Sequence, residues 1–255
     1  MKLLVKLGGT LLDDPLSPSR LASEITAISK TATVVVVHGG GKQMTRFLAE
    51  RGIESRFLNG LRVTTPEVLD AVLKIFGGSV NAGLVSAFRA AGAMPVGLTG
   101  LDAGLVDAEP LDPELGHVGR PVRSNPGLLD LLTREGYLPV VACIAGDANG
   151  GIFNINGDQM AVACASALGA DKLVFLTDVE GVQDESGEVR STLTVAEALN
   201  LIRSGVATGG MQAKLEAAVR GLQQGVAEIL ISPGARPGVL EQIAAGRPVG
   251  SRLVS

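Results

Sequence analysis

The sequence predicts an α/β protein built on an open, mainly parallel β-sheet sandwiched between α-helices, with the sheet continuing across two lobes. Short apolar runs rich in β-branched residues alternate with segments whose apolar residues recur at helical spacing, as in parallel strands joined by helices. Residues 33–37 include four consecutive valines without polar alternation, which is typical of a central strand buried on both faces. Glycines follow this strand and the first strand directly, at the sheet edge where α/β proteins bind ligands.

Length and composition argue against several classes of function. The 255 residues can bury a sizeable core, as one large domain or two lobes. A net charge of −4, a pI of about 5.3 and the absence of tryptophan argue against binding nucleic acid through phosphates or stacked bases. No apolar run reaches the ~18 residues of a membrane span, and Lys6 interrupts an N-terminal stretch that superficially resembles a signal peptide. We therefore expect a cytoplasmic protein.

The cysteines and histidines predict neither a disulfide nor a metal site. Cys143 and Cys164 each lie inside an apolar run, so we expect both to be buried as small hydrophobic side chains. His38 and His117 are isolated and lack the spacing of zinc ligands. No metal held by protein ligands is therefore expected.

The N-terminal segment predicts a βαβ unit. Residues 2–7 form the first strand, which ends at Gly8-Gly9, and apolar residues at helical spacing predict a helix over residues 19–30 before the valine strand. Lys6 stands two residues before its glycines. It is either a solvated strand lysine or a cation directed at an anion that the glycines bind.

The turn Gly39-Gly40-Gly41 ends the valine strand, where backbone N–H groups can approach an anion that a Cβ would hold off. It is not a Walker A loop, because Lys42 is followed by Gln43, and a dinucleotide fingerprint would need a further glycine at residue 44. Anion binding is the first hypothesis, and a tight strand-to-helix turn without a ligand is the alternative.

A turn of the hairpin type at Asn59-Gly60 follows a helix predicted over residues 43–51. Arg62 comes after this turn, directly before the next helix. A guanidinium beside a helix N-terminus suits a carboxylate, and a surface ion pair is the alternative.

That next helix has a capping box formed by Thr64 and Glu67. Gly77-Gly78 interrupt its apolar pattern, which then resumes. The following segment predicts a strand, a hairpin excursion, a helix and a buried strand, over residues 94–100, 101–123, 128–134 and 137–145.

The helix predicted over residues 158–168 carries Asp158 in its first turn. The helix dipole favours a carboxylate there, so a purely structural role is the alternative to a functional one. The pattern restarts at Gly169, where we place the boundary between lobes 1–168 and 169–255.

The second lobe continues the alternation, with strands over residues 172–179 and 227–231. Thr194 and Glu197 form a capping box for one helix. The helix over residues 211–223 carries Lys214 close to its N-terminus, where a cation is unfavourable, so this lysine is a candidate for function. Residues 250–254 predict a terminal edge strand.

Six motifs, taken together and in this order, resemble the acetylglutamate kinases of the amino acid kinase family over nearly the whole chain. They are Lys6-Leu7-Gly8-Gly9, His38-Gly39-Gly40-Gly41, Asn59-Gly60-Leu61-Arg62-Val63-Thr64, Asn154-Ile155-Asn156-Gly157-Asp158-Gln159, Leu176-Thr177-Asp178-Val179-Glu180-Gly181-Val182 and Gly210-Met211 with Lys214. The chain departs from the family pattern at Gly157 and at Ser232-Pro233-Gly234, which puts loop geometry near the nucleotide in question rather than the reaction.

The resemblance implies ATP-dependent phosphorylation of the γ-carboxylate of N-acetyl-L-glutamate in arginine biosynthesis, with Mg²⁺ held mainly through the phosphates of ATP. It implies substrate binding and dimerisation by the N-terminal lobe, ATP binding by the C-terminal lobe, and a homodimer. It implies catalytic roles for Lys6, Lys214 and Asp158. It assigns substrate binding to Gly40, Gly41, Arg62 and Asn154, and phosphate or nucleotide binding to Gly8, Gly9, Asp178, Val179, Glu180, Gly181, Val182, Gln183, Val206, Ala207 and Thr208.

Two other functions stay open from the sequence. One is a related kinase that acts on an aminoadipate derivative in lysine biosynthesis, which would need a wider and more basic entrance than an acidic chain suggests. The other is a non-catalytic nucleotide-binding regulator, which would have no need to keep both Lys6 and Lys214.

Overall fold

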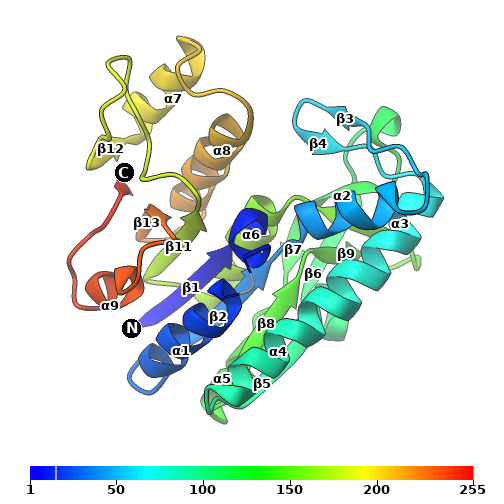
Figure 1. Ribbon diagram of the computed structural model, residues 1–255, viewed down its shortest axis with the longest axis horizontal. Helices are drawn as coiled ribbons and strands as arrows, with labels where there is room; N and C mark the ends of the chain where they lie inside the picture. Colours follow the sequence, from blue (N-terminus) through cyan, green and yellow to red (C-terminus); the bar gives the residue numbers. More distant parts are fainter. Residues whose placement is uncertain (15, 255) are drawn as a thin grey trace.

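The computed structural model describes residues 1–14 and 16–254, apart from the side chains of residues 9 and 10. Its main sheet has eight strands in the order β12-β14-β13-β11-β1-β2-β8-β5 (Figure 1). Neighbouring strands are parallel except for the β13–β14 pair. The strands are β1 (Lys2–Leu7), β2 (Thr33–His38), β5 (Pro95–Thr99), β8 (Leu138–Ala142), β11 (Lys172–Thr177), β12 (Thr192–Thr194), β13 (Glu228–Pro233) and β14 (Ser251–Val254).

The predicted lobes share this one sheet. β1 pairs with β2 on one side and with β11 on the other, so that Leu4 lies between Val35 and Leu173. All three side chains are fully buried. A strand enclosed on both faces and both edges needs apolar side chains, which residues 3–5 provide before Lys6 interrupts the run.

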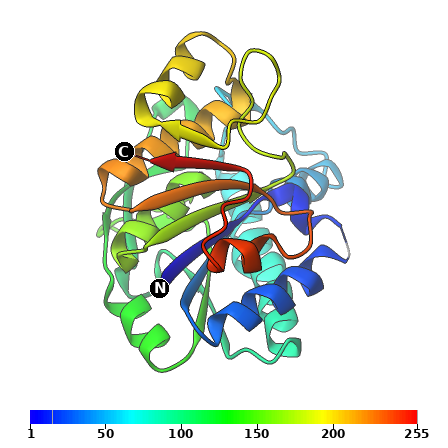
Figure 2. The same cartoon turned by 90° about the vertical axis from the view of Figure 1, so that its left-hand side faces the viewer.

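Helices cover both faces of the sheet (Figures 1 and 2). One layer consists of α1 (Ser17–Ser29), α4 (Asn81–Ala90) and α9 (Val239–Ala244), whose apolar residues share a buried cluster. The other face packs against α5 (Gly127–Arg134), α6 (Gly157–Leu168), α7 (Val195–Arg203) and α8 (Gly209–Gln223). The α/β architecture predicted from the alternating pattern is confirmed.

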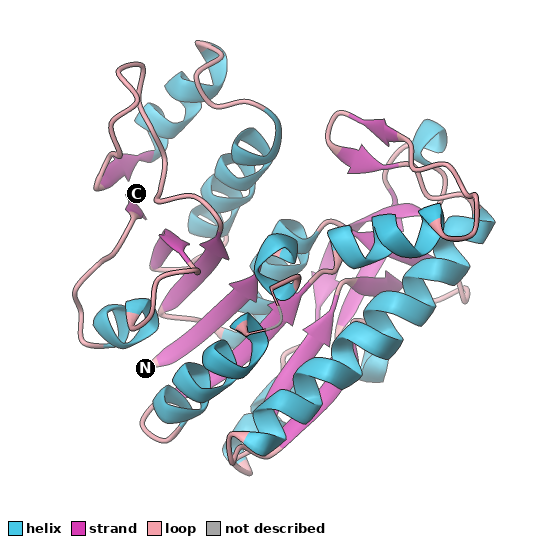
Figure 3. Cartoon of the chain, in the orientation of Figure 1, coloured by secondary structure: helices cyan, strands magenta, loops and turns pink. Residues whose placement is uncertain are grey.

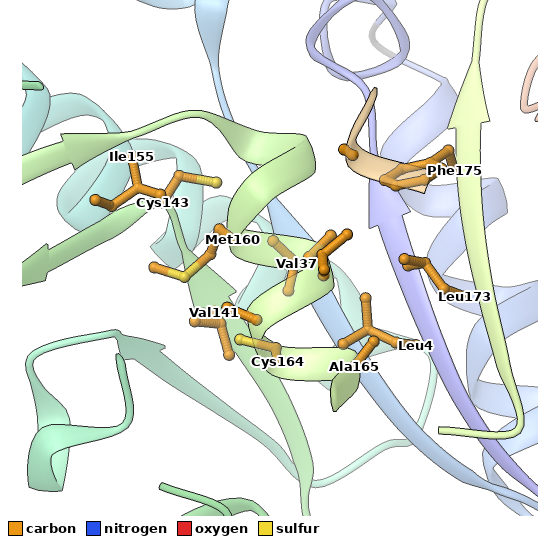
Figure 4. Packing of buried hydrophobic residues seen from close by; sticks show 14 of the residues in the cluster. Leu4, Val37, Val141, Cys143, Ile155, Met160, Cys164, Ala165, Leu173 and Phe175 are labelled. Atoms are coloured by element: carbon orange, nitrogen blue, oxygen red, sulfur yellow. The ribbon is translucent and has the colours of Figure 1, made fainter. Parts of the chain in front are cut away.

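The core between the sheet and α6 contains both cysteines. Figure 4 shows Met160 and Cys164 of α6 beside Val37 and Val141 of the sheet. Cys143 and Cys164 are free thiols and almost fully buried, as predicted. Burial raises the pKa of the Cys143 thiol to about 12, and it also raises the pKa of Cys164. Neither thiol is a reactive thiolate near neutral pH.

A second, small barrel-like sheet stands beside the main one. It consists of β10, β7, β6 and β9, with the bounds Ile152–Ile155, Val118–Ser124, Val106–Pro110 and Ile144–Gly146. The antiparallel pair β6–β7 confirms the predicted hairpin excursion. The strand predicted over residues 137–145 is corrected, because β8 ends at Ala142 and β9 belongs to this other sheet. Strand β10 brings residue 154 beside the start of α6.

Shorter elements surround the carboxyl ends of the parallel strands. Helix α2 (Gly41–Ala49) begins inside the glycine turn, and the hairpin of β3 (Phe57–Leu58) and β4 (Leu61–Arg62) projects beyond the sheet (Figure 3). Asn59 and Gly60 both have positive φ, at 50° and 79°, as the predicted hairpin turn requires. Three short 3₁₀ segments also occur, η1 (Gly9–Leu12), η3 (Asp102–Gly104) and η4 (Pro113–Leu115).

The helix after the hairpin corrects two predictions. Its N-cap is Thr65, whose hydroxyl accepts from Val68 N, because Pro66 occupies the first helical position. The glycines at 77 and 78 do not interrupt it: α3 (Pro66–Val72) continues through a π-helical segment, η2 (Leu73–Val80), into α4.

This continuous helix, Pro66–Ala90, is long and apolar enough to cross a membrane by length and composition alone. Its most apolar window has a mean hydropathy of 1.5, and 39% of that window is buried inside the protein. A core helix passes the same test, and Leu84 and Phe88 of this helix are buried against the sheet. The helix is not an unbroken apolar run in the sequence, because Asp70 and Lys74 lie within it.

The C-terminal part corrects a third prediction. β14 is not an edge strand, because it lies between β12 and β13. Neither β12 nor α9 was predicted. The capping box of Thr194 and Glu197 is confirmed at the start of α7.

Candidate active site

A cleft of about 450 Å³ opens at the carboxyl ends of β1, β2 and β11. Several predicted site residues line it, from both predicted lobes and from strands far apart in the sequence. They are Lys6, Gly8, Gly40, Gly41, Arg62, Asn154, Asp178 and Lys214. The position agrees with the general rule that open α/β sheets bind ligands beyond the carboxyl ends of their strands.

Two lysines meet one carboxylate at the floor of this cleft. Lys6 Nζ lies 2.7 Å from Asp158 Oδ1, and Lys214 Nζ lies 2.9 Å from Oδ2. The three side chains are only 11%, 14% and 7% exposed. Lys214 donates a hydrogen bond to Oδ2, whereas the Lys6 contact lacks hydrogen-bond alignment and is an ion pair. Because two ammonium groups face one carboxylate, the trio keeps one positive charge in excess.

Local structure fixes where Asp158 stands. Asn156 is the N-cap of α6, and its side-chain oxygen accepts from the backbone N–H groups of Asp158 and Gln159, at 2.9 and 3.2 Å. The carboxylate therefore sits in the first turn, where the helix dipole favours it. Lys6 reaches it from the end of β1, and Lys214 from the second turn of α8.

Charge neutralisation outweighs burial at this carboxylate. Burial alone would raise the pKa of Asp158, but attraction to Lys6 and then to Lys214 lowers it to about 2. Burial, reinforced by repulsion from Lys6, lowers the pKa of Lys214. The trio is a tightly coupled unit in which Asp158 stays ionised and holds both cations together.

The glycine turns allow close approach of the backbone. A Cβ at Gly8 would lie 2.9 Å from the Leu176 carbonyl oxygen, which accepts a hydrogen bond from Gly8 N. A Cβ at Gly40 would press on Phe76 and Val80 at 3.1–3.2 Å. At Gly41 no atom stands within 4 Å of that position, so the space beyond this residue is open.

Arg62 is held in place without a carboxylate partner. Its guanidinium donates to Thr45 Oγ1 at 2.9 Å, to Gly41 O at 3.1 Å and to Ser55 Oγ, and its Cζ lies 4.6 Å from the centre of the Phe57 ring. Burial lowers its pKa. Within the described part of the chain no acidic side chain pairs with it, which removes the surface ion pair as an explanation. The arrangement suits an anion that arrives with a ligand.

Asn154 lies on the same side of the cleft as Arg62. Its amide donates to Thr64 Oγ1 at 3.0 Å, and the Thr64 hydroxyl in turn donates to Arg62 O at 2.9 Å. Thr64, predicted as a helix cap, instead joins these two residues.

The predicted nucleotide residues are only partly brought to the cleft. Asp178 lines it and accepts from the Thr177 hydroxyl at 3.1 Å, whereas residues 179–183 and 206–208 lie outside it. Val182 is buried and donates its N–H to Ser251 Oγ. The surroundings of Gly9 lie outside what the structure describes.

Sequence reasoning missed several lining residues. Thr45 and Phe57 both support Arg62, and Phe76 lines the cleft below the glycine turn. The hairpin register gave a usable signal for Phe57, because a two-residue turn at Asn59-Gly60 places residue 57 opposite Arg62. No local signal identified Thr45 or Phe76.

Comparison with known proteins agrees with this geometry. Residues 1–232 match the model of the amino acid kinase family. The chain is 60% identical to an acetylglutamate kinase of Solibacter usitatus over the full length of both proteins, and 40% identical to an acetylglutamate kinase of Bartonella tribocorum over 99% of this chain and 89% of that one. A crystal structure of N-acetylglutamate synthase from Neisseria gonorrhoeae with coenzyme A and N-acetylglutamate superposes with a TM-score of 0.88 and 25% identity, covering all of this chain and 59% of the synthase. The chain belongs to the amino acid kinase family and, within it, to the acetylglutamate kinases.

Proposed function

We propose that this protein transfers the γ-phosphoryl group of ATP to the γ-carboxylate of N-acetyl-L-glutamate, giving N-acetyl-L-glutamyl 5-phosphate and ADP in arginine biosynthesis. The observation that carries the proposal is that Lys6, Lys214 and Arg62 line one cleft, and that the buried Asp158 behind the two lysines holds both ammonium groups. The names of full-length relatives support the choice of substrate.

The chemistry needs charge neutralisation more than a base. A side-chain carboxylate has a pKa of about 4.3 and is already an ionised nucleophile at neutral pH. The protein must align it with the phosphoryl group and offset the negative charge on the phosphoryl oxygens. The excess positive charge of the trio would offset the negative charge on the phosphoryl oxygens, and Asp158 keeps the two ammonium groups in fixed positions.

The substrates would meet at the trio from opposite sides. We assign Arg62 to the α-carboxylate of N-acetylglutamate, and Gly40, Gly41 and Asn154 to the rest of the acyl amino acid. Gly8 and Gly9 would line the phosphate path, and residues 178–183 and 206–208 would bound the nucleotide. This division makes 1–168 the acceptor lobe and 169–255 the ATP lobe.

Mg²⁺ would enter bound to ATP. In the part of the chain that the structure describes, no group of three His, Cys, Asp or Glu side chains could hold a metal ion by itself. When bound, the cation would supply further positive charge at the phosphates. Lys6 and Lys214 orient the same oxygens from the protein side.

Trapping of the acyl phosphate tests the proposed function. We expect rapid, ATP-dependent formation of a hydroxamate from N-acetylglutamate in the presence of hydroxylamine, and little from N-acetylaminoadipate, because the full-length relatives are acetylglutamate kinases. Reactions without ATP provide the blank. A preference for the longer acid would sink the assignment, and absence of turnover with either would favour a regulator.

Arg62 should act mainly on substrate binding. Arg62→Lys keeps a positive charge but loses the planar fork and its contacts to Thr45 and Phe57, so we expect KM for N-acetylglutamate to rise by about ten-fold or more while kcat changes little. The carboxylate that it binds does not react, so its contribution is similar in ground and transition states. Steady-state kinetics check this, with Arg46→Lys on the exposed side of α2 as the matched control. A main effect on kcat would contradict the assignment.

We also propose a cytoplasmic homodimer formed through the N-terminal lobe. The resemblance to the family supports this assembly, and the apolar helix Pro66–Ala90, of whose most apolar window 39% is buried within one chain, is the surface proposed for it, although no large apolar side chain of this helix is fully exposed among the described residues. Light scattering should give twice the 26.1 kDa of one chain. A monomer at micromolar concentration would exclude this assembly.

A further inference from the structure

The imidazole of His38 lies directly beneath the glycine turn, yet the proposed reaction does not use it. His38 is the last residue of β2 and is fully buried. Its Nδ1 lies 2.8 Å from the carbonyl oxygen of Gly39, and its Nε2 lies 2.9 Å from the side-chain nitrogen of Asn81. Both ring nitrogens therefore have a polar partner in the core.

These partners determine the tautomer of the ring. A carbonyl oxygen can only accept, so Nδ1 must carry the proton and donate to Gly39. In a neutral ring Nε2 is then an acceptor, which matches the N–H of Asn81. Burial lowers the pKa of His38 to about 4, so the ring is neutral at physiological pH.

Asn81 is itself fixed by its surroundings. Its amide nitrogen also donates to Val140 O at 2.9 Å, and the residue is 6% exposed. A Cβ at Gly97 on β5 would overlap its side-chain oxygen, so the glycine there makes room for the amide. With both N–H groups engaged, Asn81 can present only one orientation to His38.

The π-helical segment η2 supports the same turn from the same side. Phe76 and Val80 of η2 stand against the Cα of Gly40, and Asn81 follows η2 directly. π-helical turns are rare and occur often at functional sites. Here the segment packs two apolar side chains against Gly40, and Asn81, directly after it, hydrogen-bonds His38.

The geometry of one peptide plane connects the hydrogen bond between His38 and the Gly39 carbonyl to the cleft. The carbonyl of Gly39 and the N–H of Gly40 belong to one trans peptide and point in opposite directions. Gly39 and Gly40 line the cleft, whereas His38 does not. Fixing the carbonyl toward the buried ring therefore directs the N–H of Gly40 away from it. Among the described residues, this N–H donates no hydrogen bond to the backbone.

We propose that His38, oriented by Asn81, is a positioning residue for the acceptor: by binding the Gly39 carbonyl it holds the Gly40 N–H ready for the acyl amino acid. This rests on the proposed function, in which the glycine turn binds that substrate. His38 acts through the backbone and exchanges no proton in the reaction.

We call the two contacts of the imidazole, to the Gly39 carbonyl oxygen and to the Asn81 amide, the His38 relay. Two variants separate these two contacts. His38→Asn places an amide near the position of Nδ1 and keeps the bond to Gly39, whereas His38→Gln reaches the position of Nε2 and keeps only the contact with Asn81. We expect His38→Gln to raise KM for N-acetylglutamate by about ten-fold, the scale of one lost hydrogen bond, with kcat and KM for ATP little changed. His38→Asn should stay closer to wild type.

A control variant and a spectroscopic readout complete the test. Leu84→Ala destabilises the same helix one turn from Asn81 without touching the turn, and should leave KM unchanged. In the wild-type protein, ¹⁵N NMR should show the tautomer protonated at Nδ1, without titration between about pH 5 and about pH 9.

Three results would overturn the relay: a ring protonated at Nε2, equal rises in KM for both His38 variants, or an equal rise in KM for ATP. The tautomer can be read whether or not the protein turns over N-acetylglutamate. Failure of the proposed function and failure of the relay are therefore distinguishable.

Discussion

Replacing Lys214 by alanine is expected to lower kcat by about a hundred-fold or more, with a smaller change in KM for either substrate. The substitution removes one of the two ammonium groups beside Asp158, so the net charge of the trio falls from one positive charge to zero. The charge on the phosphoryl oxygens is redistributed during transfer, so the loss is felt most in the transition state. Lys6→Ala should behave in the same way.

A second buried ion pair provides a matched control for Lys214→Ala. Lys172 Nζ lies 2.7 Å from Glu228 Oε2, at the opposite end of the sheet, with side chains 17% and 15% exposed. Lys172→Ala therefore removes a comparably buried ammonium group far from the cleft. Steady-state kinetics, with folding checked by circular dichroism, should show a loss of kcat for Lys214→Ala alone. A Lys214→Ala enzyme with near wild-type kcat would exclude α8 from phosphoryl transfer.

Asp158→Asn is expected to lower kcat by roughly two orders of magnitude or more. The change preserves size but removes the charge that holds two ammonium groups in one place. Left facing each other, Lys6 and Lys214 should separate, and their positions no longer match the phosphoryl oxygens. Only a small part of the effect should appear in KM.

The same variant predicts a change in pH dependence. Burial and repulsion from Lys6 already lower the pKa of Lys214, and Asp158 opposes that shift. Without the carboxylate the pKa falls further, so the ammonium is lost at a lower pH and the alkaline limb of the kcat profile moves to lower pH. Glu228→Gln is the matched control. An alkaline limb that stayed in place would mean that Asp158 does not set the charge of Lys214.

Local sequence signals predicted the strands and turns better than they predicted the helix boundaries and the pairing of strands. The valine run and the Asn59-Gly60 turn each depend on a few adjacent residues, and both were predicted correctly. The N-cap was assigned to Thr64 because Glu67 three residues later completes the capping-box pattern, whereas the N-cap is Thr65 because Pro66 occupies the first helical position. The place of β14 inside the sheet depends on pairing with residues distant in sequence, which no local pattern encodes.

In the candidate site, too, single residues could be identified from local sequence, whereas the contacts between them could not. The glycines and Arg62 could be proposed from their own neighbourhoods. Lys214 was singled out by a predicted helix start at residue 211, which the structure corrects, because α8 begins at Gly209 and Lys214 lies in its second turn. Nothing local indicates that Lys214 meets Asp158, because the two residues are 56 positions apart and come from different helices. A common role for them was predicted from the resemblance to a family, and the structure shows that the two side chains are in contact.

The π-helical segment Leu73–Val80 also affects how the helix tolerates a change in its own length. A π turn accommodates one residue more than an α turn, so deleting a single residue there would let the whole of Pro66–Ala90 relax to a regular α-helix. Because the π turn had already absorbed the extra residue, the residues after it would keep their directions around the axis. Asn81 would then still face the imidazole, and the change would be confined to the segment that packs against Gly40. In this chain the π-helical segment is thus a point where the helix can shorten by one residue without redirecting the side chains that follow.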